Sequence, residues 1–229
     1  GLDAIVARNV QDGRLRFSTD LVSAIEGARA IFIAVGTPPK ADGSADLRYV
    51  AEVARSIAAH MNGPKLVITK STVPIGTGRL IETIIEESGK RNLVSVVPNP
   101  EFLREGSAVQ DFLHPDRVVI GADDQSAAIR VAALYVGVPA PLMVTDPASA
   151  ETIKYASNAF LATKISFINA VATICEQVGA DVNDVVLGMG YDKRIGHEFL
   201  KPGPGWGGSC FPKDSRALVH IADNAGYSF

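Results

Sequence analysis

The sequence predicts an α/β protein in which a doubly wound parallel sheet is followed by a long connecting helix and a helical domain. Short apolar runs rich in β-forming residues alternate with helical patterns over the first part of the chain. These runs are continuously hydrophobic, as expected of parallel strands buried on both faces. The alternation stops near Asp146-Pro147, where a long apolar helical repeat follows. We therefore expect two domains, residues 1–146 and 147–229.

Five strands are predicted from the apolar runs. Strand–helix alternation implies right-handed crossovers and an open sheet. In such sheets ligands bind beyond the carboxyl ends of the strands, and this is where glycines, prolines and hydroxyl residues cluster in the sequence. The strands are expected at Ala30–Val35, Lys65–Lys70, Leu93–Val97, Arg117–Gly121 and Leu142–Val144.

The predicted helices include one of exceptional length, from Ser149 to about Val178, with Gly179 as its stop. Ser149 gives a partial capping pattern, and Glu151 suits the positive end of the helix dipole. A helix this long does not fit a β–α–β unit, so we expect it to connect two lobes or to pack against a second subunit. Shorter helices are expected at Thr19–Glu26, Asp46–His60, Gly76–Ser88, Gln125–Tyr135, Asp181–Gly188 and Lys213–Gly226.

The composition is that of a globular protein and excludes several functional classes. Hydrophobic residues make up 47% and charged residues 21% of the chain, and the net charge of −3 offers no basic footprint for nucleic acid or a membrane surface. No uninterrupted apolar run has membrane-spanning length. The four histidines are scattered, so we expect no metal site. Two cysteines form no disulfide framework and suit a reducing, cytoplasmic environment.

The segment Gly207–Asp214 (GGSCFPKD) points to chemistry more strongly than any other. Its Cys210 lies just ahead of a predicted helix whose first turn would contain Pro212. That position, with Lys213 nearby, favours the nucleophilic thiolate. The flanking glycines leave room for another molecule to approach the backbone. The alternative for a cysteine in a tight turn is a small buried residue, as we expect for Cys175 in the long helix.

Lys154 and Asn158 are four residues apart, so they share one face of the long helix. A solvated helix edge would explain them equally well by spacing alone. The functional interpretation is a cation and an amide directed at one oxygen, where they would stabilise developing negative charge.

A second group follows the predicted strands. Glu101 and Glu105 flank Arg104 after a Pro-Asn-Pro corner, and they form either a surface charge cluster or a site for a general base. Thr72, after another strand, has turn capping as its simplest explanation. Asp214 alone would be a first-turn residue that complements the helix dipole.

Taken together, these segments resemble the nucleotide-sugar 6-dehydrogenases of the UDP-glucose/GDP-mannose dehydrogenase family, and the members that oxidise UDP-glucose most of all. Several motifs occur in the family's order over nearly the whole chain, so the resemblance does not depend on one of them. The matching segments are Val35–Pro38, Lys70–Gly76, Asn99–Gly106, Lys154–Asn158, Arg194–Gly196 with Phe199–Leu200, and Gly207–Asp214.

The resemblance implies a Rossmann-like fold and a four-electron oxidation of a sugar primary alcohol to a carboxylate with two NAD molecules in turn. Cys210 would add to the aldehyde, giving a thiohemiacetal and then a thioester that water releases. Lys154 and Asn158 would stabilise the oxyanion. Asp214 and Thr72 would position water or accept protons through it, and Glu101 would act as general base for hydrolysis. The division of base roles among Glu101, Asp214 and Lys154 stays open.

The resemblance also implies binding residues and a homodimer formed through the long helix and the central domain. Arg194 would reach the substrate of the neighbouring subunit. NAD would be lined by Gly36, Thr37, Thr72, Glu105 and Lys213. UDP-glucose would be bound by Glu101, Phe102, Leu103, Lys154, Asn158, Arg194, Phe199, Leu200, Lys201 and Gly207.

Two parts of the family pattern are absent from the sequence. The glycine-rich dinucleotide turn and its ribose-binding acid would precede Gly1, and a nucleotide-binding domain would follow Phe229. We therefore expect a segment of a longer polypeptide, with an N-terminally incomplete sheet and no activity by itself. Trp206 stands where the family more often has phenylalanine.

Alternative functions are distinguished by single residues. Phe211, where GDP-mannose dehydrogenases usually have leucine, and the loop from Arg194 to Leu200 favour UDP-glucose. Ser209, in place of a histidine, disfavours UDP-N-acetylmannosamine. A non-catalytic nucleotide-sugar binding protein would have no use for Cys210. A redox-sensing cysteine protein is a further alternative that no residue supports.

Overall fold

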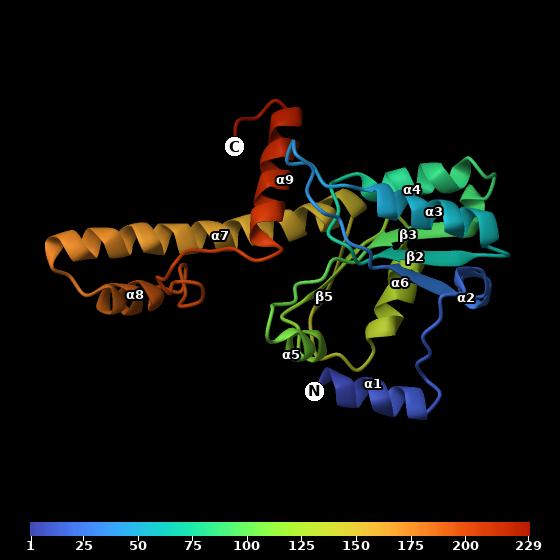
Figure 1. Cartoon of the computed structure of the whole chain (residues 1–229), viewed down its shortest axis with the longest axis horizontal. Helices are drawn as coiled ribbons and strands as arrows, with labels where there is room; N and C mark the ends of the chain where they lie inside the picture. The colour runs from blue at the N-terminus through green and yellow to red at the C-terminus, as the bar shows by residue number, and fades with distance from the viewer. The chain divides into compact units, whose positions relative to one another are not determined.

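A computed structural model describes all of residues 1–229 (Figure 1). The chain forms two compact units, which are considered one at a time. The first comprises Gly1–Thr37 and Asp46–Lys154, and the second comprises Pro38–Ala45 and Tyr155–Phe229. The division falls within the long helix α7 (Pro147–Val178), whose first residues belong to one unit and whose remainder belongs to the other.

The first unit contains the five predicted strands, and all of their pairings are parallel. Strands β1 (Ala30–Ile33), β2 (Lys65–Thr69) and β3 (Val94–Pro98) form one sheet in that order. In its register Ile31 lies beside Val67, which lies beside Val96. Strands β4 (Val118–Gly121) and β5 (Leu142–Thr145) pair separately. The prediction of parallel strands is confirmed, although hydrogen bonds divide them between two sheets.

Apolar side chains cover both faces of the three-stranded sheet at β2 and β3, as the continuous hydrophobic runs predicted, whereas the edge strand β1 leaves Phe32 45% exposed. Every residue of β2 is buried, and its side chains alternate between two cores. Val67 packs with residues of the helices α3 (Arg48–His60) and α4 (Thr77–Glu86), which appear together beside the sheet in Figure 1. Leu66 and Ile68 pack with residues of α6 (Gln125–Ala132). This is the doubly wound arrangement that the strand–helix alternation predicted.

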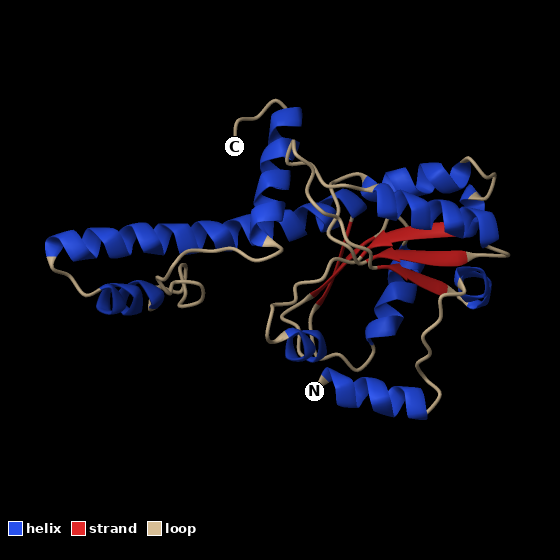
Figure 2. Cartoon of the chain, in the orientation of Figure 1, coloured by secondary structure: helices blue, strands red, loops and turns tan.

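Two helices of this unit were not predicted. Helix α5 (Ala108–Leu113) has only six residues, too few to show a helical period. Helix α1 (Leu2–Gln11) repeats apolar residues at helical spacing and was overlooked, and the structure buries none of its residues. Helix α2 (Leu21–Gly27) lies where a helix was expected. Single 3₁₀ turns occupy Arg91–Leu93 and Ala133–Tyr135, the second where the predicted helix at Gln125–Tyr135 tightens. Figure 2 shows the helices and strands of the chain in separate colours.

Helix α7 begins two residues before the predicted start. Asp146 caps it, because its carboxylate accepts a hydrogen bond from the Ser149 backbone N–H at 2.8 Å and another from the Ser149 hydroxyl at 2.6 Å. Pro147 then occupies the first helical position, where its missing N–H leaves no bond unmade. The predicted cap at Ser149 is therefore wrong by three residues. By length and composition, α7 is the one helix that could cross a membrane. Core helices of globular proteins meet the same criterion of length and composition.

The second unit contains the rest of α7 and the helices α8 (Val182–Gly190) and α9 (Phe211–Asn224). Asp181 caps α8 through a hydrogen bond from the Asn183 backbone N–H. Cys175, expected in the core, is buried. A long loop joins α8 to α9, and it ends at Cys210, directly before α9 begins.

Candidate active site

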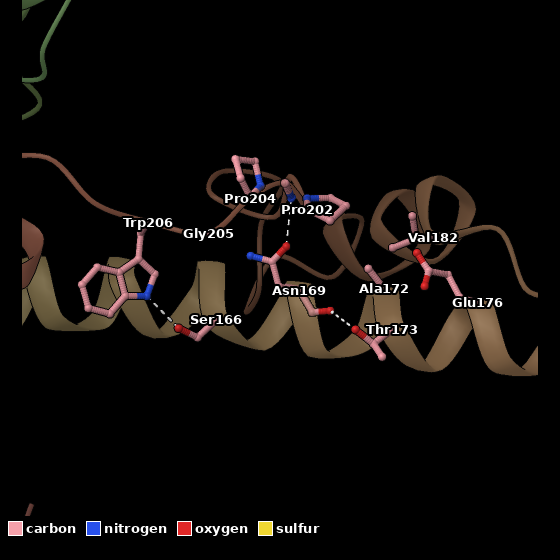
Figure 3. Close-up of a pocket in the computed structure, with 11 residues that line it drawn as sticks. Ser166, Asn169, Ala172, Thr173, Glu176, Val182, Pro202, Pro204, Gly205 and Trp206 are labelled. Atoms are coloured by element: carbon pink, nitrogen blue, oxygen red, sulfur yellow. Dashed lines mark hydrogen bonds between the residues drawn. The ribbon is translucent and has the colours of Figure 1, made fainter.

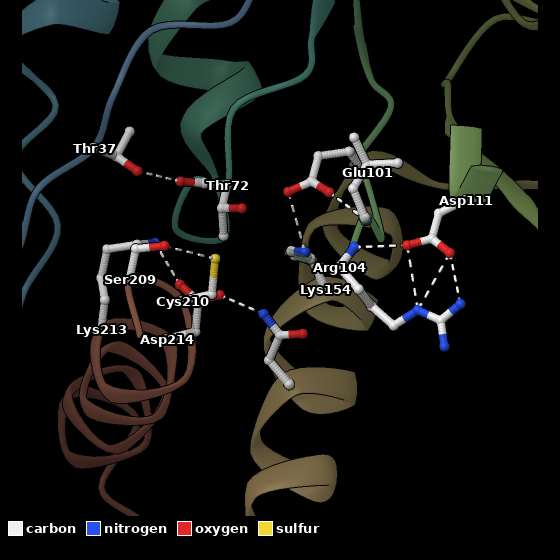
Figure 4. A network of polar contacts seen from close by, with 12 residues as sticks. Thr37, Thr72, Glu101, Arg104, Asp111, Lys154, Ser209, Cys210, Lys213 and Asp214 are labelled. Atoms are coloured by element: carbon white, nitrogen blue, oxygen red, sulfur yellow. Dashed lines mark hydrogen bonds and ion pairs between the residues drawn. The ribbon is translucent and has the colours of Figure 1, made fainter. Parts of the chain in front are cut away.

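In the first unit, the predicted ligand-binding edge of the sheet is held together by hydrogen bonds between its loops. The Thr37 hydroxyl, after β1, donates to the Thr72 carbonyl, after β2, at 2.7 Å (Figure 4). The Ser71 hydroxyl donates to the Val35 carbonyl at 2.7 Å. These bonds fix two of the predicted cofactor residues, Thr37 and Thr72, beside each other. Gly36 is exposed there, so its backbone is open to a ligand.

A buried cation lies beside the loop that follows β3. Lys154, on the first turns of α7, has a side chain only 4% exposed, and its Nζ lies 3.4 Å from Glu101 Oε1. The other carboxylate oxygen, Oε2, accepts the Leu103 backbone N–H at 2.5 Å. The Phe102 ring lies 5.4 Å from the Lys154 ammonium, a favourable cation–π distance. The structure thus brings four of the predicted substrate residues together and holds the lysine charge in a fixed position.

Sequence reasoning missed a second lysine in this unit. Lys70 Nζ donates to Asn99 Oδ1 at 3.2 Å and to the Tyr135 hydroxyl at 3.1 Å. Burial lowers the pKa of Lys70 to about 8, an effect that the Lys154 charge strengthens and the Glu101 charge opposes. Lys70 opens the conspicuous Lys70–Gly76 segment, yet nothing in the sequence places Tyr135 beside it.

Glu151 has a larger role than the dipole interaction predicted for it. Its carboxylate accepts the backbone N–H groups of Gly76 at 2.6 Å and Gly78 at 2.9 Å, at the N-terminus of α4. Gly76 has a φ of 92°, in the left-handed region that favours glycine. Burial raises the pKa of Glu151, while these two hydrogen bonds act in the opposite direction. Glu151 therefore ties the start of α7 to α4, one turn before Lys154.

In the second unit, Cys210 is exposed at the N-cap position of α9, with Pro212 in the first turn as predicted. Its Sγ lies 3.6 Å from the Ser209 hydroxyl, close enough for a weak hydrogen bond (Figure 4). A free, accessible thiol at a helix N-terminus is the environment in which cysteines act as nucleophiles.

Asp214, one turn into α9, is fully buried. Its carboxylate accepts a hydrogen bond from the Asn158 amide at 2.5 Å and forms an ion pair with Lys213. Asn158 belongs to the α7 residues of this unit, and it is itself 7% exposed. The carboxylate therefore does more than complement the helix dipole, because it joins α9 to α7 within one turn of Cys210.

The remaining predicted residues differ in their placement. Phe199 has a φ of 61° and packs edge-on against Phe211 with ring centroids 6.4 Å apart, while Leu200 is buried. Arg194 is 89% exposed and is held by Asp192 at 2.6 Å. Three further residues, Glu105, Lys201 and Gly207, are exposed. No group of three or more histidine, cysteine, aspartate or glutamate residues is arranged to hold a metal ion.

Comparison with known proteins relates both units to one family. Residues 1–138 match the family model described as "UDP-glucose/GDP-mannose dehydrogenase family, NAD binding domain", and residues 148–229 match the model of the central domain of that family. The chain is 54% identical to UDP-glucose 6-dehydrogenase TuaD of Bacillus subtilis over its whole length, and 53% identical to UDP-glucose 6-dehydrogenase of Rhizobium meliloti over 98% of it.

Two solved structures give the same relationship. A UDP-glucose dehydrogenase from Pyrobaculum islandicum matches 97% of the chain with a TM-score of 0.93 and 46% identity. A GDP-mannose dehydrogenase from Pseudomonas aeruginosa, solved as a ternary complex, matches 99% with a TM-score of 0.82 and 35% identity. The chain spans 50% and 53% of the two curated relatives and 52% and 54% of the two solved chains.

Proposed function

We infer that this chain, which belongs to the UDP-glucose/GDP-mannose dehydrogenase family, serves the NAD-dependent oxidation of the primary alcohol of a nucleotide sugar to a carboxylate. The observation that carries the proposal is the exposed thiol of Cys210 at the N-terminus of α9, one helical turn from the buried Asp214–Asn158 pair. A binding protein without chemistry needs no such thiol.

The substrate we propose is UDP-glucose. The two curated relatives, 54% and 53% identical to this chain over the aligned residues, are named for it, whereas the GDP-mannose dehydrogenase structure is 35% identical. Phe211 and the loop from Arg194 to Leu200 support the same choice. GDP-mannose is the alternative substrate.

The reaction we propose removes two hydrides from C6 of the sugar in turn, and with each hydride the oxygen on C6 loses its proton to water. The cofactor NAD, when bound, supplies the hydride acceptor for both oxidations. Between them, the Cys210 thiolate forms a bond to the aldehyde carbon and gives a thiohemiacetal. Loss of the second hydride makes a thioester, and water then adds to its carbonyl. The C–S bond breaks, the thiol regains its proton and the carboxylate leaves.

The other residues are assigned roles that suit their surroundings. Lys154 and Asn158 lie one turn apart on α7, and we propose that both stabilise the C6 oxyanion. Glu101, held by Lys154 and the Leu103 N–H, is proposed as general base for hydrolysis. Asp214 and Thr72 would orient the attacking water or relay its proton.

We propose binding residues from their positions after the strands and around Cys210. The exposed backbone at Gly36 and the linked Thr37 and Thr72 suit a dinucleotide beyond the strand ends. NAD would be held by Gly36, Thr37, Thr72, Glu105 and Lys213. The nucleotide sugar would be held by Glu101, Phe102, Leu103, Lys154, Asn158, Arg194, Phe199, Leu200, Lys201 and Gly207.

We also propose a homodimer, a domain division and a location. Phe160, Phe167 and Ile174 recur every seven residues on α7 and are 65%, 53% and 59% exposed, an apolar stripe that suits a second copy of the chain. Residues 1–146 would form the NAD-binding domain and residues 147–229 the central domain. Because both cysteines are free thiols, as is typical of a reducing compartment, we place the protein in the cytoplasm.

The test is the number of NADH molecules formed per UDP-glucose consumed, using protein from the complete reading frame. We expect two, with steady turnover lost in Cys210→Ser and retained in Cys175→Ala, the matched control at the other, buried cysteine. One NADH per sugar, or a Cys210→Ser variant as active as the wild type, would remove Cys210 from the mechanism. Turnover of GDP-mannose alone would reassign the substrate.

The isolated 229-residue chain is expected to bind NAD weakly and to be inactive, because it lacks the glycine-rich phosphate-binding turn. Isothermal titration with NAD measures this directly. Tight binding would contradict the expectation without affecting the role of Cys210.

A further inference from the structure

The loop that leads to Cys210 passes over a cavity in the second unit. The cavity has a volume of about 790 Å³ and lies between this loop and α7 (Figure 3). The loop itself contributes only prolines, glycines and one aromatic residue to the lining, at residues 202–206. Within residues 202–206 the hydrogen bonds to α7 come from Gly203 and Trp206.

Two hydrogen bonds connect the loop to α7 across this cavity. The Trp206 indole Nε1–H donates to the Ser166 hydroxyl at 2.7 Å, and the Gly203 backbone N–H donates to Asn169 Oδ1 at 2.9 Å (Figure 3). Ser166 and Asn169 are three residues apart and therefore lie on one face of the helix. Both acceptors belong to the rigid helix, and both donors belong to the loop.

Trp206 also reaches the residue that follows the thiol. Its ring lies edge-on to Phe211, with centroids 6.4 Å apart and an interplanar angle of 83°. Phe211 is the first residue of α9 and is bonded directly to Cys210. One indole side chain therefore contacts α7 through its N–H and the start of α9 through its ring.

We propose that the Trp206–Ser166 hydrogen bond is a latch that positions Cys210, with Trp206 and Ser166 acting as positioning residues rather than catalytic ones. A phenylalanine at position 206 keeps the ring contact but has no N–H to donate. The hydrogen bond itself does not depend on the proposed function. Only the role of Cys210 as a nucleophile rests on that function.

The test compares Ser166→Ala, Trp206→Phe and the double variant in protein from the complete reading frame. Loss of one neutral hydrogen bond changes an equilibrium between closed and open loop by about threefold to tenfold. We expect amide hydrogen exchange in residues 201–209 to accelerate by that factor in each single variant. The double variant should exchange no faster, because both substitutions remove the same bond.

Two matched controls separate the latch from a general effect on α7. Ser166→Thr keeps a hydroxyl acceptor and should retain wild-type exchange. Thr173→Ala removes a hydroxyl that lines the same cavity but bonds only to its own helix, at the Asn169 carbonyl, and should also behave as wild type. Unchanged exchange in Ser166→Ala and Trp206→Phe, or independent, multiplying effects in the double variant, would overturn the latch.

Positioning of the thiol is measured by two further quantities. The rate of Cys210 alkylation by iodoacetamide, followed by peptide mass, should change in both single variants, because the backbone that carries the exposed thiol is no longer held against α7. The kcat for UDP-glucose follows the fraction of enzyme with the loop closed, so it should fall by no more than about tenfold, with the thermal midpoint within about 2 °C of the wild type. Faster exchange with unchanged alkylation would overturn the positioning role. Changed alkylation in an enzyme that oxidises neither UDP-glucose nor GDP-mannose would support the latch and refute the proposed function.

Discussion

Removal of the Asp214 carboxylate should destabilise the second unit strongly. The group is fully buried and has two partners, the Asn158 amide at 2.5 Å and the Lys213 ammonium, whose side chain is 16% exposed. Removing one partner of a buried charge pair typically lowers the free energy of unfolding by about 3 to 5 kcal/mol, because the other charge is left without a partner. We therefore expect Asp214→Ala to lower the free energy of unfolding by about 3 to 5 kcal/mol.

Asp214→Asn should have a smaller effect. The amide keeps the volume of the side chain and one oxygen for the Asn158 donor, but it gives the Lys213 ammonium no counter-charge. A hydrogen bond to a charged group contributes about 1.5 to 3 kcal/mol, against about 0.5 to 1.5 kcal/mol for a neutral one. The difference over two contacts predicts a loss of about 2 kcal/mol.

Urea unfolding of the 229-residue chain measures these values. Trp206 is the only tryptophan and lies in the same unit as Asp214, so its fluorescence follows that unit. Asp12→Ala is the surface control. Asp12 pairs with Arg14 while their side chains are 42% and 60% exposed, so its loss should cost less than about 1 kcal/mol. A cost below about 1 kcal/mol for Asp214→Ala would refute the reasoning.

Three further predictions concern other parts of the chain. Because burial lowers the pKa of Lys70 to about 8, the unfolded state, with its ordinary pKa of 10.5, binds more protons above pH 8. As the pH increases from 7 to 10, the free energy of unfolding of the wild type should therefore rise by up to about 3 kcal/mol relative to that of Lys70→Met. Thermal midpoints of the two proteins that change in parallel with pH would contradict this. Glu151→Ala leaves the Gly76 and Gly78 N–H groups without their acceptor, so it should lower the free energy of unfolding in urea by about 2 to 3 kcal/mol. The control is Leu80→Ala, at a half-exposed residue of α4. Phe167→Asp places a charge in the exposed stripe of α7 and should convert the proposed dimer to monomer in analytical ultracentrifugation, whereas a wild type already monomeric would refute the dimer.

The sequence was sufficient for the features that depend on local patterns. Continuous apolar runs placed all five strands, and β2, β3 and β4 are buried as such runs predict. Burial on both faces was wrong for β5, where Leu142, Met143 and Val144 are about half exposed. Proline and glycine placed Cys210 before α9, and helical spacing placed Lys154 and Asn158 one turn apart. The same rules failed for α5, which is too short to show a period, while α1 was overlooked although apolar residues recur along it at helical spacing.

Only the tertiary structure could decide which distant groups meet. Glu151 contacts Gly76 across 75 residues, Tyr135 contacts Lys70 across 65, and Asp214 contacts Asn158 across 56. Composition and spacing predicted that reactive residues exist, while their partners, burial and pKa values depend on how the chain folds back on itself. The periodicity of a sequence indicates which face of a helix or strand is buried, but it does not indicate which other element covers that face. For this reason only the tertiary structure showed the roles of Glu151, Lys70 and Trp206.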